Sequence, residues 1–270
     1  MLNRMRSCST AAMVAVLSFL GLGALRFAHA QPPGQATLRI AAAADLGPVL
    51  PPLLDRFERQ TGIHAEASYQ SSAALTMQML NGAPFDLFLS ADLSYPQRIV
   101  AAGLAVSAAP IPYARGTLVL FTRHDSRWPV PKLDTLRDPA LRRLAIANPD
   151  RAPYGRAALA ALTSLGLLEA LKPRLVTAEN IAQAAQFAET GNADAGLISL
   201  TAALTPALRS AGSYFVLPRD LYPPITQGAV VLAKSPRRQN AQRLLDFLLS
   251  PEIQRQLALS GLQPVHRILR

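Results

Sequence analysis

The chain has 270 residues, a formal net charge of +10 and a single cysteine, and half of its residues are hydrophobic. Its basic residues are scattered, with no run longer than the pairs Arg142-Arg143 and Arg237-Arg238. Nucleic-acid-binding surfaces instead gather basic residues together with aromatic ones. We therefore assign the charge to a solvated basic surface and exclude nucleic acid as a partner.

The first thirty residues, 1–30, have the pattern of a secretory signal peptide. Arg4 and Arg6 give a positive start, residues 11–25 are apolar and uncharged, and the Ala-His-Ala that ends at Ala30 fits a cleavage site. An apolar stretch of about fifteen residues is short for a bilayer-spanning helix, which needs about 20. The sequence therefore predicts export to the periplasm and cleavage after Ala30; the alternative is a retained N-terminal anchor.

Short β-type runs then alternate with helical stretches. In the first part of the chain the pattern predicts three strands separated by two helices, in the order 38–43, 49–60, 64–69, 73–80 and 86–90. Gly62 follows the first helix and suits a left-handed cap. A β-α-β-α-β order predicts a parallel sheet with helices on both faces.

The same alternation returns further along the chain. Strands are predicted at 117–122, 143–147, 174–177, 195–199 and 228–232, and helices at 155–165, 181–190, 238–249 and 251–259. A second β-α-β unit implies a second lobe. We therefore expect two α/β lobes with a cleft between them, which is where small-molecule sites usually lie.

Several predicted helices start in segments that suit an anion. Asp45, Ser72, Tyr154 and Asn180 follow predicted strands directly or after a short loop. The backbone N–H groups of a helix start lack partners inside the helix and attract negative charge. Each segment also has an ordinary structural explanation: Ser71-Ser72 and Asn180 as helix caps, and the residues before Tyr154 as a proline-shaped loop. The set as a whole favours anion binding.

Catalytic signatures are missing from the sequence. It contains no Gly-x-Ser-x-Gly, no Gly-x-x-x-x-Gly-Lys-Ser/Thr and no His-Glu-x-x-His. His64, His124 and His266 are far apart and lack the spacing of metal ligands. We expect neither an enzyme nor a bound cofactor.

The ordered set of motifs resembles the periplasmic molybdate-binding proteins of ATP-binding-cassette (ABC) importers over nearly the whole mature chain. The matching segments are Ala42–Leu46, Ser71-Ser72, Asn81–Asp92, Ala147–Gly155, Glu179–Phe187, Gly191–Gly196 and Tyr222–Leu232. The resemblance implies the two-lobed type II periplasmic-binding-protein fold, each lobe with a mixed, mostly parallel sheet flanked by helices. It places lobe 1 at 31–114 and 226–270, and lobe 2 at 115–225.

The resemblance also implies which residues contact a tetrahedral dianion. They are Ala44, Asp45, Ser72, Tyr154, Ile181 through its backbone N–H, and Ser199. Two positions depart from the usual pattern: Asp45 stands where serine or asparagine is common, and Ser199 where a tyrosine often supplies a hydroxyl. Tyr154 would supply that phenol from the other side.

Asp45 is the difficult residue, because two unit charges of like sign 4 Å apart repel by about 4 kcal/mol at an effective dielectric constant of 20. Three arrangements would avoid this repulsion. Asp45 caps its own helix by accepting from the N–H of Gly47; it is protonated in the closed site; or it accepts a hydrogen bond from a protonated oxyanion such as hydrogen phosphate. The first is the expected arrangement.

The sequence thus predicts a monomeric periplasmic receptor that binds molybdate, and tungstate, and delivers it to an inner-membrane ABC permease. Alternatives are a receptor for another anion, such as phosphate, sulfate or an organic acid, and an exported enzyme. The same fold also serves in transcription regulators, but those carry a DNA-binding helix-turn-helix and no export signal.

Overall fold

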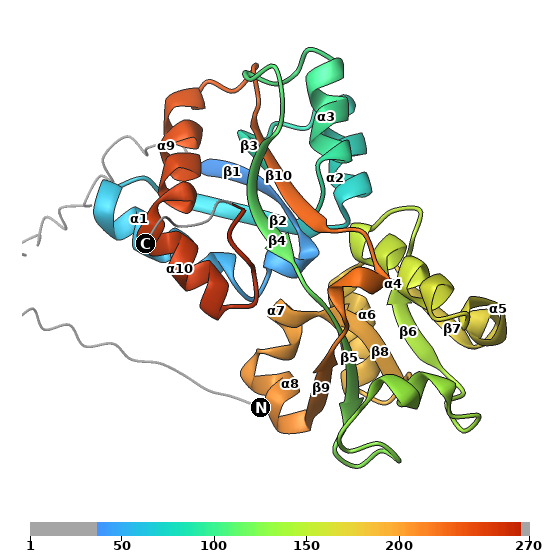
Figure 1. The fold of residues 1–270 in the computed structure, drawn as a ribbon. Coiled ribbons are helices and arrows are strands. Elements are labelled where there is room, and N and C mark those ends of the chain that lie inside the picture. The colour runs from blue at the N-terminus through green and yellow to red at the C-terminus, as the bar shows by residue number, and fades with distance from the viewer. Residues whose placement is uncertain (1–36, 266–270) are drawn as a thin grey trace, which may run out of the picture. The chain divides into compact units, whose positions relative to one another are not determined.

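The computed structural model describes residues 37–265, which all lie in one structural unit (Figure 1). The predicted signal peptide and its cleavage site lie outside the described residues. Two five-stranded sheets organise this unit. The first sheet has the order β2 (Ala65–Gln70), β1 (Leu38–Ala43), β3 (Leu87–Ser90), β10 (Ile225–Val231) and β4 (Ile111–Gly116). The second has the order β7 (Leu175–Ala178), β6 (Leu144–Ala147), β8 (Ala195–Ser199), β5 (Leu118–Arg123) and β9 (Gly212–Val216).

The first sheet is covered on both faces. Strand β1 lies between β2 and β3 and pairs with both in parallel, and all its residues except Arg39 are buried. One face packs against α1 (Leu50–Thr61), α9 (Arg238–Leu249) and α10 (Pro251–Leu259). The other packs against α2 (Ser72–Leu80) and α3 (Ser94–Ala101), as Figure 1 shows. Since both faces are buried, β1 is apolar on both sides, as parallel strands usually are.

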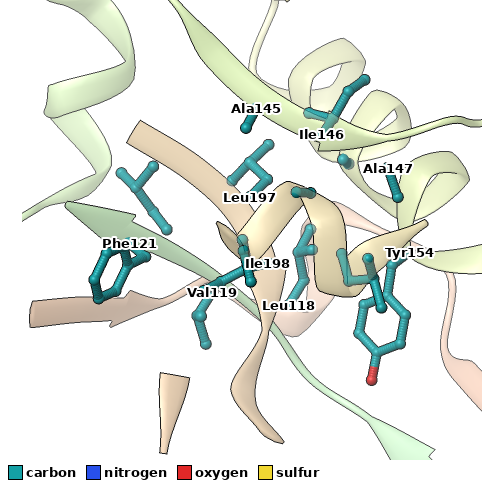
Figure 2. Close-up of a cluster of buried hydrophobic side chains, with 14 of the residues drawn as sticks. Leu118, Val119, Phe121, Ala145, Ile146, Ala147, Tyr154, Leu197 and Ile198 are labelled. Atoms are coloured by element: carbon teal, nitrogen blue, oxygen red, sulfur yellow. The ribbon is translucent and has the colours of Figure 1, made fainter. Parts of the chain in front are cut away.

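The second sheet is covered chiefly by α4 (Pro153–Ser164) and α6 (Ile181–Glu189). Their buried faces are rich in alanine, so the helices can lie close to the strands. Figure 2 shows the aliphatic side chains of β5, β6 and β8 with Tyr154 at the margin of the cluster, its hydroxyl pointing away from them. Shorter helices complete this part: α5 (Leu168–Leu171), α7 (Leu200–Ala203) and α8 (Pro206–Ala211).

The structure confirms the predicted two mixed sheets flanked by helices, with more antiparallel pairing than expected. In each sheet two strand pairs are parallel and two are antiparallel. The difference arises because β4 and β9 escaped prediction. Both are edge strands with half-exposed residues, and β4 contains Pro112, which is tolerated at an edge.

The chain passes between the sheets twice. It leaves the first sheet after Gly116, enters the second at Leu118, and returns between Val216 and Ile225. The residue bounds predicted for the two lobes stay a prediction. Within residues 37–265, no helix has the combined length and apolar composition that a membrane span requires.

Most predicted elements agree with the structure to within two residues. Gly62 has a φ of 71° and its N–H bonds to the carbonyl of Glu58 at 2.8 Å, which confirms the predicted left-handed cap. Helix α4 begins at Pro153, two residues before the predicted start, so Tyr154 lies in its first turn. Helices α3, α5, α7 and α8 were not predicted.

Asp86 ties the start of β3 to β1 and to the segment after β10. This residue is 1% exposed. Its carboxylate accepts hydrogen bonds from the N–H of Arg39 at 2.7 Å, the hydroxyl of Ser235 at 2.6 Å and Nε of Arg237 at 2.9 Å. A buried carboxylate is stable only when paired in this way.

Asp86→Ala is therefore expected to lower the free energy of unfolding by about 3 kcal/mol, because it leaves Arg237 and two other donors without their acceptor. Urea unfolding followed by circular dichroism measures this. Asp55→Ala, at an exposed position of α1, is the control and should change stability by less than about 0.5 kcal/mol. Equal effects of the two variants would contradict the role given to Asp86.

Candidate functional site

Four helix starts follow parallel strands. The short 3-10 helix η1 (Ala44–Leu46) follows β1 directly, and α2 begins two residues after β2. In the second sheet, α4 follows β6 and α6 follows β7. Because β1 and β2 run parallel, as do β6 and β7, the helix starts of each sheet lie at the carboxyl ends of its strands. Ligands of open α/β sheets bind at these ends.

The four helix starts line one small cavity. Its volume is about 10 Å³, which is room for about one water molecule. Its walls are Ala43, Ala44, Asp45, Gln70, Ser71, Ser72, Ala91, Ala152, Pro153, Tyr154, Asn180 and Ile181. Residues that follow strands of both sheets therefore face the same space.

Larger cavities lie elsewhere within residues 37–265. One, of about 180 Å³, is next to the two chain crossings and is lined by residues that include Arg115 and Arg219. A second, of about 230 Å³, lies beside Phe85 and Lys234, and a third, of about 380 Å³, is lined by residues 236–240. None of these three collects helix starts from both sheets, so we place the candidate site in the small cavity.

Neutral hydrogen-bond donors surround the cavity. Ser72 and Ile181 are the first residues of α2 and α6, and their N–H groups have no acceptor inside their own helices. The Ser72 hydroxyl accepts from the N–H of Ala91 at 3.1 Å, which leaves its own hydrogen to donate. Ser71 and Asn180 cap these helices, accepting at 3.4 and 3.0 Å from N–H groups of the first turn. These segments therefore cap their helices and also present free N–H groups to the cavity, so the structural role and the anion-binding role are compatible.

The Asp45 side chain joins the two halves of the site. Its Oδ2 accepts a hydrogen bond from the hydroxyl of Tyr154 in α4 at 3.0 Å and another from Nε2 of Gln227 in β10. Asp45 and Tyr154 are each 1% exposed and Gln227 is fully buried. A polar contact between the two sheets is thus closed off from water.

The expectation that Asp45 caps its own helix is wrong. The N–H of Gly47 bonds to the carbonyl of Ala44 at 3.2 Å, and η1 has no side-chain cap. The carboxyl is engaged by Tyr154 and Gln227 instead. The Asp45 carboxyl therefore accepts hydrogen bonds from two side chains that are distant in the sequence, and not from the nearby backbone N–H.

Burial dominates the electrostatics of this contact. Desolvation raises the pKa of Asp45 from its ordinary 3.8 to about 6, although the hydrogen bonds from Gln227 and Tyr154 act in the opposite direction. Burial, reinforced by the nearby Asp45 carboxylate, raises the pKa of Tyr154 well above its usual range. Tyr154 therefore remains a hydroxyl donor at neutral pH.

Gln227 and Gly116 are site residues that the sequence analysis missed. Gln227 lies in Tyr222–Leu232, one of the segments that carry the family resemblance. A polar glutamine within a buried strand could have indicated a functional residue there. Gly116 leaves room for Tyr154, since a Cβ at that position would lie 2.2 Å from the Tyr154 hydroxyl oxygen. No local pattern marks that close approach.

Five of the six predicted residues meet at the cavity: Ala44, Asp45, Ser72, Tyr154 and Ile181. Ser199 is buried but is not among the lining residues. Its hydroxyl oxygen accepts from the hydroxyl of Thr201 at 2.9 Å and from the N–H of Ala202 at 3.3 Å, so it caps α7. Its predicted contact with a ligand stays a prediction.

A second group of contacts joins segments of the two sheets near the protein surface. Arg156 of α4 forms an ion pair with Asp92, and its guanidinium lies over the ring of Tyr95, 5.4 Å from the centroid. The Tyr95 hydroxyl donates to the backbone carbonyl of Asp150 at 3.3 Å. The Arg156 side chain is 43% exposed, so its ion pair with Asp92, unlike the contact between Asp45 and Tyr154, reaches solvent, whereas Tyr95 itself is buried.

Two mixed α/β sheets, two chain crossings and one cavity between helix starts define a two-lobed solute-binding protein. Comparison with protein families agrees: the model described as "Bacterial extracellular solute-binding protein" matches residues 38–263. The chain belongs to this family.

Individual relatives show the same relationship. The chain is 38% identical to the molybdate-binding protein ModA of Azotobacter vinelandii over 80% of this chain and 86% of that protein. It is 40% identical to ModA of Rhodobacter capsulatus over 73% and 76% of the two chains. The solved structure of the Azotobacter vinelandii periplasmic molybdate-binding protein superposes with a TM-score of 0.80 at 31% identity, covering 85% of this chain and all of that one.

The raised pKa of Asp45 predicts a pH-dependent effect of Asp45→Asn on stability. The neutral acid is favoured in the folded protein, so its contribution is complete below about pH 3.8 and is lost as the pH rises through about 6. The shift corresponds to about 3 kcal/mol. At pH 8 the variant, which carries no charge to bury, should therefore be more stable than the wild type by up to about this amount.

Urea unfolding at pH 4.5 and pH 8 tests this expectation, and the gain should shrink at the lower pH. Asp55→Asn removes an exposed carboxylate and should show no such difference. If Asp45→Asn raised the free energy of unfolding equally at both pH values, Asp45 would not be a buried carboxylate without a compensating positive charge.

Proposed function

We propose that this protein is a periplasmic receptor that binds molybdate, and tungstate, in the cavity between the four helix starts and delivers it to an ABC permease of the inner membrane. The observation that carries the proposal is the convergence of neutral donors from both sheets on one small cavity. Relatives at 38–40% identity are named as molybdate-binding proteins. The predicted signal peptide supports the periplasmic location.

Neutral donors suit a dianion that must be both held and released. Each helix start contributes on the order of 0.3 to 2 kcal/mol toward a negative charge. The Ser72 hydroxyl and the N–H groups of Ser72, Ile181 and Asp45 would point to the ion's oxygens. Without a cationic side chain in the lining, the ion is held by dipoles rather than by an ion pair.

Binding requires the lobes to move. The cavity has room for about one water molecule, and the lining residues Asp45, Ser72 and Tyr154 are each 1% exposed, so the two sheets must separate before an ion fits between them. The ion would then stabilise the closed arrangement, which is the form that a permease distinguishes from the open one. This function needs no bond-making step, in agreement with relatives that are solute-binding proteins.

A second candidate is a receptor for hydrogen phosphate, which the Asp45 carboxyl favours. Its Oδ1 is buried and has no partner among residues 37–265. An ionised carboxylate could accept a hydrogen bond from a protonated oxyanion, whereas it would repel a fully deprotonated one. Phosphate must therefore be included in any ligand comparison.

Thermal unfolding of the purified mature protein should distinguish these ligands. We expect molybdate and tungstate to raise Tm, since a ligand at 100 times its Kd stabilises the folded state by about 2.7 kcal/mol. Sulfate and phosphate at the same concentration should leave Tm unchanged. A Tm rise with phosphate alone would replace molybdate by the second candidate.

Ser72→Ala should weaken molybdate binding by roughly 10- to 150-fold, because a hydrogen bond to a charged group contributes about 1.5 to 3 kcal/mol. Isothermal titration calorimetry measures the change. Ser210→Ala, at an exposed serine of α8, should leave the affinity within about twofold. Unchanged affinity in a folded Ser72→Ala protein would remove Ser72 from the site.

A further inference from the structure

Two buried side-chain oxygens have no hydrogen-bond partner within residues 37–265: Oδ1 of Asp45 and Oε1 of Gln227. These two side chains are already in contact, because Nε2 of Gln227 donates to Oδ2 of Asp45. Each unpartnered atom is an acceptor when Asp45 is ionised, so no rearrangement of the existing hydrogens joins them. Leaving two buried acceptors unsatisfied is costly.

A single added proton satisfies both atoms. A neutral carboxylic acid has one donor and one acceptor, as does one edge of a primary amide. We propose that, once the dianion is bound in the closed site and its negative charge adds to the effect of burial, Asp45 carries a proton on Oδ1 and donates it to Oε1 of Gln227, so that the acid and the amide form a cyclic pair with two hydrogen bonds. The Tyr154 hydroxyl then completes the contacts of Oδ2.

Within residues 37–265, no positively charged side chain is in contact with Asp45 to keep it ionised. Tyr154 and Tyr113 face it from α4 and β4, and burial raises the pKa of both phenols, so both stay neutral. The other titratable side chains on the neighbouring elements have partners or positions of their own. Arg156 pairs with Asp92, and Glu66 pairs with His64. Arg115 lines another cavity, Tyr69 is half-buried on β2, and Glu189 lies at the far end of α6. Burial, which raises the pKa of Asp45, therefore acts unopposed by a cation.

This inference rests on the proposed function and adds a linked proton to it. In an open protein the Asp45 carboxyl meets water and is ionised at neutral pH, as an ordinary aspartate is. Closing on a dianion would then take up one proton from solvent, which removes the repulsion between carboxylate and ligand. Molybdate affinity should accordingly fall as the pH rises, by tenfold per pH unit once the open form is fully ionised.

Isothermal titration calorimetry with molybdate from pH 7 to pH 9, in two buffers of different ionisation enthalpy, tests the proposal on the whole mature protein. The wild type should take up close to one proton per molybdate and lose about tenfold in affinity per pH unit. Asp45→Asn should bind without proton uptake and with a flat pH profile, because its amide supplies the same donor and acceptor to Gln227 permanently.

Asp150→Asn is the matched control, since it removes one exposed negative charge and should keep the proton uptake and the pH slope of the wild type. A direct readout comes from infrared difference spectra of the molybdate complex, where a carbonyl band of a neutral carboxylic acid should be present in the wild type and lost in Asp45→Asn. Molybdate binding with neither proton uptake nor pH slope would overturn the acid–amide pair while leaving the proposed function intact. Failure of the wild type to bind molybdate at any of these pH values would instead contradict the proposed function.

Discussion

Parallel pairing of β1 with β2 and of β6 with β7 is the constraint on which the site depends. Parallel strands need a long crossover connection, and in this protein each of these strands is followed by a helix, so each delivers a helix start to the same edge of its sheet. Because both sheets have helix starts at this edge, several sets of N–H groups without partners inside their helices are present there. Unpaired N–H groups that attract negative charge are therefore brought together by the topology before any charged residue is chosen.

The second determinant is how the two sheets meet. Tyr154 reaches from α4 to Asp45, and this approach is possible because Gly116 has no side chain. Gln227 comes from β10, the strand that returns to the first sheet after the second has been completed. The polar contact at the centre thus combines segments from the beginning, the middle and the end of the chain.

The sequence could predict the helix starts because their signals are local. Gly62, Ser71 and Asn180 each mark the end or start of a helix by their own conformational preferences, and all three do so in the structure. The edge strands β4 and β9 were not predicted, because their half-exposed residues give no clear alternation of apolar and polar positions.

The hydrogen-bond partners of Asp45 were not predicted, for a different reason. Gln227 is 182 residues away along the chain and Tyr154 is 109 residues away, so no pattern near Asp45 indicates either contact. The local donor at Gly47 was the natural sequence-based choice, but in the structure it serves Ala44. Family resemblance located Asp45 at the site, whereas its hydrogen-bond partners required the three-dimensional arrangement.

The ion pair of Arg156 with Asp92 has a consequence of its own. Coulomb attraction between solvent-exposed groups is screened within about 8 Å at physiological ionic strength, whereas hydrogen bonds between buried neutral groups are hardly affected by salt. Of the contacts that join segments of the two sheets, the Arg156–Asp92 ion pair therefore weakens as the ionic strength rises, whereas the buried contact of Tyr154 with Asp45 does not. Substitution at Arg156 should thus alter the salt dependence of the attraction between these segments, and substitution at Tyr154 should leave that salt dependence unchanged.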